Sequence, residues 1–481
     1  MKNRRHVLLY SFACTCLALV FCSVQLTYSL EEPSDLVLID DVPHVLQKDD
    51  FRGEACIAMY LSKLGHDTTQ DHVFNLAELD PALGRGCFTR EMVIVLKKIG
   101  FKPGKTWYRI DPEKSEREID DQWNKLLSDL QNDIPSIVCM HYDDNPETTE
   151  HFRLVVGYDS ESDEVIYHEP AEEDGAYRRM DRSMFLKLWP LKYRRNEWTV
   201  IRMALEAGEI DLGGPAEGYT AADFAQHVMA LKPNVPEGFT IVVQPPFVVI
   251  GDEKPAIVNV RAERTVKWFS DQMKKLYFPK NPPEIFDIWL FKNNTSYRKH
   301  AKELFDDEPD TPYGYFSYAN GALVMNIGTG GGTLCHELVH AFMPSNFPEC
   351  PAWFNEGLGS LYEQSGERDG SAVGLTNWRL AGLKRVIKAD ALPSFRALCS
   401  TTTHQFYNMT SGDNYAQARY LCYYLQEKKL LKKFFEEFRK NVEDDPSGYA
   451  TLKKILGIRS ESDMQKFQTR WEKWVLGLKF P

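Results

Sequence analysis

The spacing of hydrophobic and polar positions divides the chain into two predicted domains. Residues 37–203 alternate between stretches with helical periodicity and short apolar runs typical of strands. A segment rich in glycine, glutamate and proline follows and predicts a linker over residues 204–237. Residues 238–481 form the second predicted domain. Both parts mix helices with strands, so the pattern predicts an α+β protein.

The second domain is predicted to begin with a sheet and to continue as helices. The expected strands cover residues 239–243, 247–250, 285–291, 315–318 and 322–326. A helix is expected over residues 254–276, and Asn320-Gly321 predicts a hairpin between the last two strands. A glycine-rich turn at 328–332 leads to Thr333, which is placed to cap the next helix. The chain after Pro351 is mainly helical in pattern, which predicts a sheet lobe followed by a helical lobe.

The helix after Thr333 carries the sequence His336-Glu337-Leu338-Val339-His340. Residues four apart lie on one face of a helix, so the two imidazoles can share one metal ion. Glu356 follows sixteen residues after His340, within Trp353-Phe354-Asn355-Glu356-Gly357, and is the candidate third ligand. Two histidines and one carboxylate leave a coordination position open, which is typical of a catalytic zinc site.

Such a site predicts hydrolysis of an amide bond. The metal would polarise the scissile carbonyl and acidify a water, and Glu337 would accept the proton and pass it to the leaving amine. Tyr415 is our candidate donor to the developing oxyanion, with Tyr420 as the alternative. The strand at 322–327 is expected to align an extended peptide by strand addition. Two other interpretations stay open: buried histidines satisfied by carboxylates, and a zinc site without peptidase function.

These motifs resemble the gluzincin metallopeptidases of the thermolysin-like clan, over roughly residues 239–440. The resemblance rests on the strand before the glycine-rich turn, the HELVH sequence and the tryptophan that precedes Asn-Glu-Gly. It implies one zinc ion, a two-lobed fold and the residue roles given above. The chain departs from the family at Ser360, where many members have an acidic residue four positions after the ligand glutamate. Glu363 lies one turn further on, so the partner of the ligand histidines is not assigned.

The first domain contains Gln47, the run Arg52-Gly53-Glu54-Ala55, His151 and Glu169-Pro170. With these residues it resembles the papain-like, bacteriocin-processing (double-glycine) peptidases over about residues 38–195. That family has a glutamine for the oxyanion hole, then a nucleophilic cysteine followed by Gly-Pro-Ala. The corresponding residues here are Gln47 and the run that begins at Arg52. His151 lies on a predicted strand and corresponds to the family's histidine. Glu169, which precedes Pro170, stands where the family has the aspartate that orients this histidine. The resemblance therefore implies a papain-like fold with a vestigial site.

The nucleophile position is occupied by Arg52, which cannot form a thioester. Cys56, four residues later, is the candidate for a shifted nucleophile. The cleft around Arg52 would otherwise bind an acidic group such as a peptide carboxylate, or the domain would serve only as a scaffold.

The N-terminus predicts export. Lys2, Arg4 and Arg5 precede an uncharged stretch over residues 7–28, as in a secretory signal. Residues 1–30 are therefore expected to form a signal peptide, or an N-terminal anchor if they are not cleaved. The expected location is secreted or periplasmic, or attached to the membrane by residues 7–28.

The formal net charge of −12 argues against nucleic acid or an anionic lipid surface as a partner, because both require a basic face. Seven of the ten cysteines follow the predicted signal, without metal-binding spacing, and a Cys335–Cys350 disulfide is one option.

The sequence thus predicts an exported zinc metallopeptidase that acts on a peptide or protein substrate, preceded by a papain-like domain for substrate or partner binding. A non-enzymatic binding or scaffold protein built from two inactive peptidase domains is the alternative, and a cysteine peptidase that uses Cys56 is a third. The sequence does not predict the oligomeric state.

Overall fold

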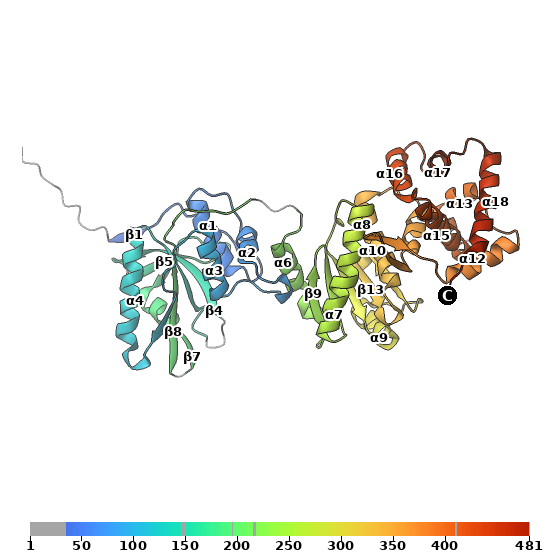
Figure 1. Ribbon diagram of the computed structural model, residues 1–481. Coiled ribbons are helices and arrows are strands. Elements are labelled where there is room, and N and C mark those ends of the chain that lie inside the picture. Colours follow the sequence, from blue (N-terminus) through green and yellow to red (C-terminus); the bar gives the residue numbers. More distant parts are fainter. Residues whose placement is uncertain are drawn as a thin grey trace, which may run out of the picture.

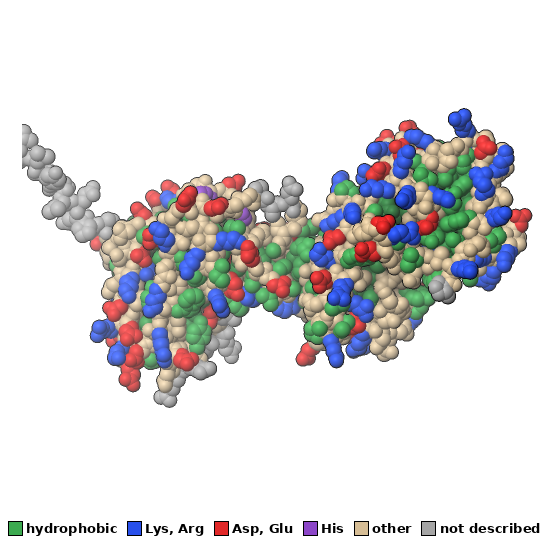
Figure 2. Space-filling model, in the orientation of Figure 1, with side chains coloured by type: hydrophobic (Ala, Val, Ile, Leu, Met, Phe, Trp, Pro, Cys, Tyr) green, Lys and Arg blue, Asp and Glu red, His purple; other side chains and the backbone are tan. Residues whose placement is uncertain are grey.

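The computed structural model describes residues 35–145, 148, 150–194, 196–214, 218–408 and 411–480. The predicted signal peptide or anchor, residues 1–30, lies outside the described residues. Within the described ranges, no helix combines the length and apolar character that a membrane crossing needs. Two bodies follow one another along the chain and meet at helix α6 (Figure 1). On the face seen in Figure 2, acidic and basic side chains are interspersed over both bodies.

The first body is an antiparallel sheet with helices. The sheet has the order β2-β8-β3-β4-β5-β6, with β1 beside β4 and β7 beside β8. Its strands are β1 Leu36–Leu38, β2 Trp107–Ile110, β3 Ser136–His141, β4 Glu150–Asp159, β5 Glu164–His168, β6 Arg178–Asp181, β7 Leu191–Arg194 and β8 Glu197–Ala204. Its helices are α1 Arg52–Lys63, α2 Gln70–Ala77, η1 Pro81–Leu83, α3 Thr89–Ile99, η2 Pro112–Lys114, α4 Ser115–Leu130 and α5 Arg182–Leu188.

Strands β3 and β4 are buried over almost their whole length, because α1 and α4 both pack against β4. Figure 1 shows α4 on one side of this sheet and α1, α2 and α3 on the other. Sheets covered on both faces favour continuous apolar runs over alternation. Helix α3 is capped at its C-terminus by Gly100, which has φ 117°. A β-carbon there would lie 2.0 Å from the carbonyl oxygen of Glu209, so the position requires glycine.

The second body begins with a five-stranded sheet in the order β12-β13-β11-β10-β9. The strands are β9 Thr240–Gln244, β10 Phe247–Gly251, β11 Phe286–Phe291, β12 Gly314–Ser317 and β13 Ala322–Asn326. Successive residues of β10 point to opposite faces. Val249 joins the core beneath the helical lobe, and Val248 joins a second core on the other side of the sheet. The five expected strands are therefore confirmed.

Helices and one small hairpin complete the second body. The helices are α7 Pro255–Arg261, η4 Ala262–Lys267, α8 Trp268–Leu276, α9 Asn294–Phe305, η5 Tyr318–Asn320, η6 Ile327–Thr329, α10 Gly332–Asn346, α11 Ala352–Leu361, α12 Arg379–Lys388, α13 Phe395–Cys399, α14 Thr403–Asn408, α15 Ser411–Glu427, α16 Leu431–Asn441, α17 Tyr449–Leu456 and α18 Glu461–Gly477. Among the helices, α7 and α9 pack against strands of the sheet. The hairpin consists of β14 Ser365–Arg368 and β15 Ser371–Gly374. A sheet followed by helices agrees with the α+β expectation.

Three details of this body differ from the sequence prediction. The strand at 322–326 pairs with β12 on one side and β11 on the other, so its edge is not open to a peptide; β12 holds the outer position. Helix α10 begins at Gly332, so Thr333 lies inside it and does not cap it. Cys335 and Cys350 form no disulfide, and all seven cysteines of the described residues are free.

The predicted linker, residues 204–237, contains a helix that packs on both bodies. Helix α6 spans Ala221–Leu231 and is followed by η3 at Lys232–Asn234. Its Ala225 joins the core of the first body, whereas Phe224 and Val228 join the core beneath β10 and α9. His227 Nε2 lies 2.8 Å from Asp287 Oδ1 on β11. The linker is therefore structured where it meets the second domain.

Candidate functional site

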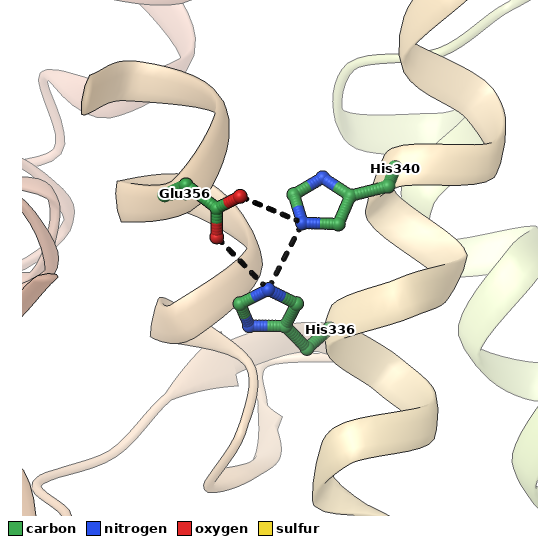
Figure 3. A group of neighbouring side chains, drawn as sticks. All are labelled: His336, His340 and Glu356. Carbon is green, nitrogen blue, oxygen red and sulfur yellow. Dashed lines mark hydrogen bonds and ion pairs between the residues drawn. The ribbon is translucent and has the colours of Figure 1, made fainter. Parts of the chain in front are cut away.

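Helices α10 and α11 bring the three predicted metal ligands together (Figure 3). His336 Nε2 lies 3.1 Å from Glu356 Oε2, and His340 Nε2 lies 3.5 Å from Glu356 Oε1. The two Nε2 atoms are 2.9 Å apart. One ligand atom from each residue lies within 4.8 Å of the others. The spacing of the sequence motif thus produces a single convergent donor set.

The opposite nitrogen of each imidazole faces an oxygen atom. His340 Nδ1 donates to Asn355 Oδ1 at 2.9 Å, and His336 Nδ1 lies 3.4 Å from Glu363 Oε1. A proton on each Nδ1 leaves both Nε2 lone pairs directed at the same point as the Glu356 carboxylate. A shared cation satisfies this arrangement. Two nitrogens and a carboxylate oxygen are ligands that zinc prefers, so the residues fit that ion.

The electrostatics of the site also favour a cation. Burial opposes a charge on His336, but the carboxylates of Glu356, Glu363 and Glu337 outweigh it and raise the pKa of His336 to about 10. Burial likewise opposes ionisation of Glu356, yet its bonds to the two imidazoles hold its pKa well below the usual range. Several buried carboxylates around one point create a negative potential that a divalent cation would neutralise.

Glu363 is the acidic residue that faces His336, a partner that could not be assigned from the sequence. Arg379 on α12 binds both of its carboxylate oxygens, at 2.9 Å through Nε and 2.7 Å through Nη2. Burial acts against ionisation of Glu363, but Arg379 and His336 lower its pKa to about 2. The acidic partner of His336 thus comes from one turn beyond Ser360. The number of positions between Glu356 and Glu363 along the sequence differs from the family pattern. No sequence pattern marked Arg379 as the partner of Glu363.

Glu337 faces a pocket of about 830 Å³ in front of α10. The glycine-rich turn at residues 329–332 and Tyr313-Gly314, at the start of β12, line the same pocket. Burial raises the pKa of Glu337, and the neighbouring imidazoles offset part of this effect. Within the described residues, its carboxylate has no hydrogen bond or ion pair. A carboxylate with a raised pKa and no partner suits a general base.

Two tyrosines approach the ligand Glu356. Tyr415 is half-buried and lines the pocket, and burial together with the Glu356 charge raises its pKa. The Tyr407 hydroxyl donates to Glu356 Oε1, a contact that no sequence pattern indicated. Tyr420 is fully buried, and its hydroxyl contacts the backbone of Asn377. Tyr415 therefore suits the predicted role better than Tyr420, whose hydroxyl is bonded to backbone and is not part of the pocket lining.

In the first domain, the predicted histidine and acid are paired. His151 Nε2 contacts Glu169 Oε1, and Arg153 Nε donates to Glu169 Oε2 at 2.7 Å. All three residues are buried. Burial is the main cause that lowers the pKa of His151, whereas the bonds from His151 and Arg153 overcome burial and lower the pKa of Glu169. Gln47 lies beside this pair, since its backbone N–H donates to Pro170 O at 2.8 Å.

Arg52 is the first residue of α1 and forms an ion pair with Asp50. Both residues line a pocket of about 800 Å³, which also includes Phe88, Trp107 and Tyr193. Cys56 is fully buried on the same helix, and burial raises its pKa well above the ordinary range. A thiol in this environment is inert. Of the four vestigial-site residues, the structure brings Gln47, His151 and Glu169 together, while Arg52 lines the pocket.

Comparisons with known proteins agree with the first domain. Residues 39–196 match the model of the Peptidase_C39 like family. This match supports the expected papain-like relationship of the first body. One solved structure that matches is the peptidase domain of Streptococcus ComA, a bi-functional ABC transporter involved in a quorum-sensing pathway. The two share 20% sequence identity, and the match covers 34% of this chain and 98% of that chain, with a TM-score of 0.24. No curated protein matches the chain.

Proposed function

We propose that the chain is an exported zinc metallopeptidase whose active site lies between α10 and α11. The observation that carries this proposal is the convergence of His336, His340 and Glu356 beside Glu337, which faces an open pocket and is unpaired within the part of the chain that the structure describes. The uncharged stretch over residues 7–28, preceded by basic residues, supports export.

His336, His340 and Glu356 would hold the zinc ion. When bound, zinc supplies a Lewis acid that acidifies water and polarises a carbonyl group. Glu337 would accept a proton on its carboxylate during attack and return it to the leaving amine, and its raised pKa favours both transfers. Tyr415 lines the same pocket and would donate its hydroxyl proton to the developing oxyanion.

Strand β12 would align the substrate. It forms the edge of the sheet beside the pocket, and its first residue, Gly314, is part of the pocket lining. An extended peptide can add to such an edge through backbone hydrogen bonds. This arrangement transfers the predicted role of residues 322–327 to the neighbouring strand.

The first domain would bind substrate or partner without thiol chemistry. The burial of Cys56 and the presence of Arg52 at the nucleophile position support this role. A non-enzymatic scaffold is the second candidate function, since Cys56, the candidate shifted nucleophile, is fully buried.

Zinc content and turnover test the proposal together. Residues 31–481 are expected to bind roughly one zinc per chain. His336→Ala should lose the zinc, whereas His66→Ala in the first domain should keep it. Glu337→Gln should keep the zinc but should no longer cleave a peptide mixture, with cleavage measured by mass spectrometry. Cleavage that survives Glu337→Gln would contradict the mechanism, and a zinc-loaded protein that cleaves nothing would favour the scaffold.

A further inference from the structure

A π-helical segment forms one wall of the pocket in front of α10. It is η4, Ala262–Lys267, and it joins α7 to α8 without a break. π-Helical turns are rare and frequent at functional sites, because the wider turn redirects side chains. Ala262 and Val266 anchor the segment in the core, and the segment contacts α10. Its other residues include Arg264 and Thr265, which both line the pocket.

Arg264 is a cation without a partner. It is exposed and, among the described residues, makes no hydrogen bond or ion pair. The second arginine of the pocket, Arg379, is already held by Glu363 through two bonds. Lys267, at the end of the same π-helical segment, pairs with Asp271 at 2.6 Å. The guanidinium of Arg264 is therefore the cation of this pocket that is available to a ligand.

The rest of the pocket offers Arg264 no internal counter-charge. Its two carboxylates are Glu337, which belongs to the proposed chemistry, and Glu363, which is bound to Arg379. The remaining lining consists mainly of hydroxyl groups, glycine backbone and aromatic rings, including the exposed rings of Tyr313 and Trp378. A ligand in this pocket meets a positive charge at the π-helical wall and apolar rings elsewhere.

We propose that Arg264 selects substrates that carry a carboxylate near the scissile bond, either on an acidic side chain or at the C-terminus of the peptide. A planar guanidinium binds a carboxylate through two parallel hydrogen bonds, and a neutral amide cannot replace that contact. A neutral analogue lacks this charge-assisted contact, so the site should favour the carboxylate. This inference rests on the proposed function, since it assigns the substrate class of the same site.

The test uses peptide pools with one fixed position, occupied by Glu, Gln or Lys, and with a free or amidated C-terminus. The zinc-loaded full chain is compared with Arg264→Gln and Arg264→Glu, and Lys267→Gln serves as the matched control. We expect the wild-type chain to cleave the Glu pool, or the pool with a free C-terminus, at least about tenfold faster than its neutral counterpart. Arg264→Gln should abolish this ratio, Arg264→Glu should favour Lys, and Lys267→Gln should leave the ratio unchanged.

Comparing the pools with a free and an amidated C-terminus identifies the source of the carboxylate. A preference that survives amidation belongs to an acidic side chain, and one that amidation removes belongs to the chain terminus. Cleavage with ratios that Arg264→Gln does not alter would overturn the inference while sparing the proposed peptidase.

A peptide-binding experiment distinguishes failure of the carboxylate selection from failure of the proposed peptidase activity. The same pools are passed over zinc-loaded Glu337→Gln, and the retained peptides are identified by mass spectrometry. Enrichment of carboxylate-bearing peptides that Arg264→Gln removes, without any turnover in the wild-type chain, would support the inference and refute the peptidase. Neither turnover nor enrichment would refute both.

Discussion

Replacing Glu54 tests whether a buried carboxylate makes the first domain more stable in acid than at neutral pH. Glu54 is fully buried on α1, where Oε1 accepts from Cys87 N at 2.6 Å and Oε2 has no partner within the described residues. Burial is the main cause that raises its pKa from 4.5 to about 7. The folded domain thus binds this proton more tightly than the unfolded chain. Its stability should fall as the pH rises through the range from about 4.5 to about 7.

The magnitude follows from the two pKa values. They differ by about 2.5, and one pKa unit corresponds to 1.36 kcal/mol, so ionised Glu54 costs about 3 kcal/mol. Glu54→Gln removes the titration. Its amide group also places an unpaired donor near the position of Oε2, which costs about 1–3 kcal/mol at every pH. The diagnostic quantity is therefore the pH dependence of the difference between wild type and variant.

Thiol labelling measures this difference inside the intact protein. Cys56 is fully buried on the same helix as Glu54, so it reacts only when α1 opens, while buried Cys422 reports on the second domain. Labelling with dithiodipyridine, mapped by mass spectrometry, gives both rates at one pH. Between about pH 5 and about pH 8, the Cys56 rate of wild type relative to Glu54→Gln should rise more than tenfold, and the Cys422 ratio should stay constant. Equal pH profiles for the two proteins at Cys56 would refute the reasoning.

Three further substitutions probe the two sites. Glu363→Gln should weaken zinc binding about 10–100-fold in a chelator competition, because the ligand imidazole loses its charged partner, whereas exposed Glu367→Gln should not. Gly359→Val should also weaken zinc binding with unchanged circular dichroism, since a β-carbon there already lies 3.3 Å from the His336 ring; an unchanged affinity would show that the ring can shift freely. Arg52→Cys places a thiol at the N-terminus of α1, and its alkylation should reveal a pKa below the ordinary value of about 8.5; an ordinary value would place it outside the influence of the helix.

The convergence of His336, His340 and Glu356 could be predicted because its geometry is mostly local. One helical turn fixes the relation between His336 and His340, and a short connection from α10 brings Glu356 onto the neighbouring helix. The interaction of Glu363 with Arg379 could not be predicted in the same way. It depends on how α12 packs after a hairpin, and no period in the sequence records that packing.

The strand order shows a similar limit. The hairpin around Asn320-Gly321 was predicted, but a hairpin alone does not say which of its strands lies outside. The parallel pairing of β13 with β11 decides this and leaves β12 at the edge. Helix α6 was missed for another reason. Glycine and proline dominate the preceding segment, although Thr220 and Asp223 form a capping box that marks the start of the helix.

Retention of His151 and Glu169 does not require catalysis by the first domain. Glu169 binds both His151 and Arg153, and all three side chains are buried. Removal of one partner from such a network leaves a buried charge uncompensated, at about 3–5 kcal/mol. The stability of this network is therefore sufficient to account for these residues, with Arg52 at the predicted nucleophile position.

The second domain differs because two charged side chains of its pocket have no partner within the described residues. Glu363 and Arg379 satisfy one another, yet Glu337 and Arg264 face the same pocket without a hydrogen bond or ion pair within the described residues. Folding gains nothing from an unpaired carboxylate beside two imidazoles, because burial raises its pKa and disfavours its charge. Opposite charges that stay separate on two walls of one pocket can both be satisfied by a bound peptide that offers a proton to one and a carboxylate to the other. These features support the proposal that the second domain carries the chemistry and that the first domain binds.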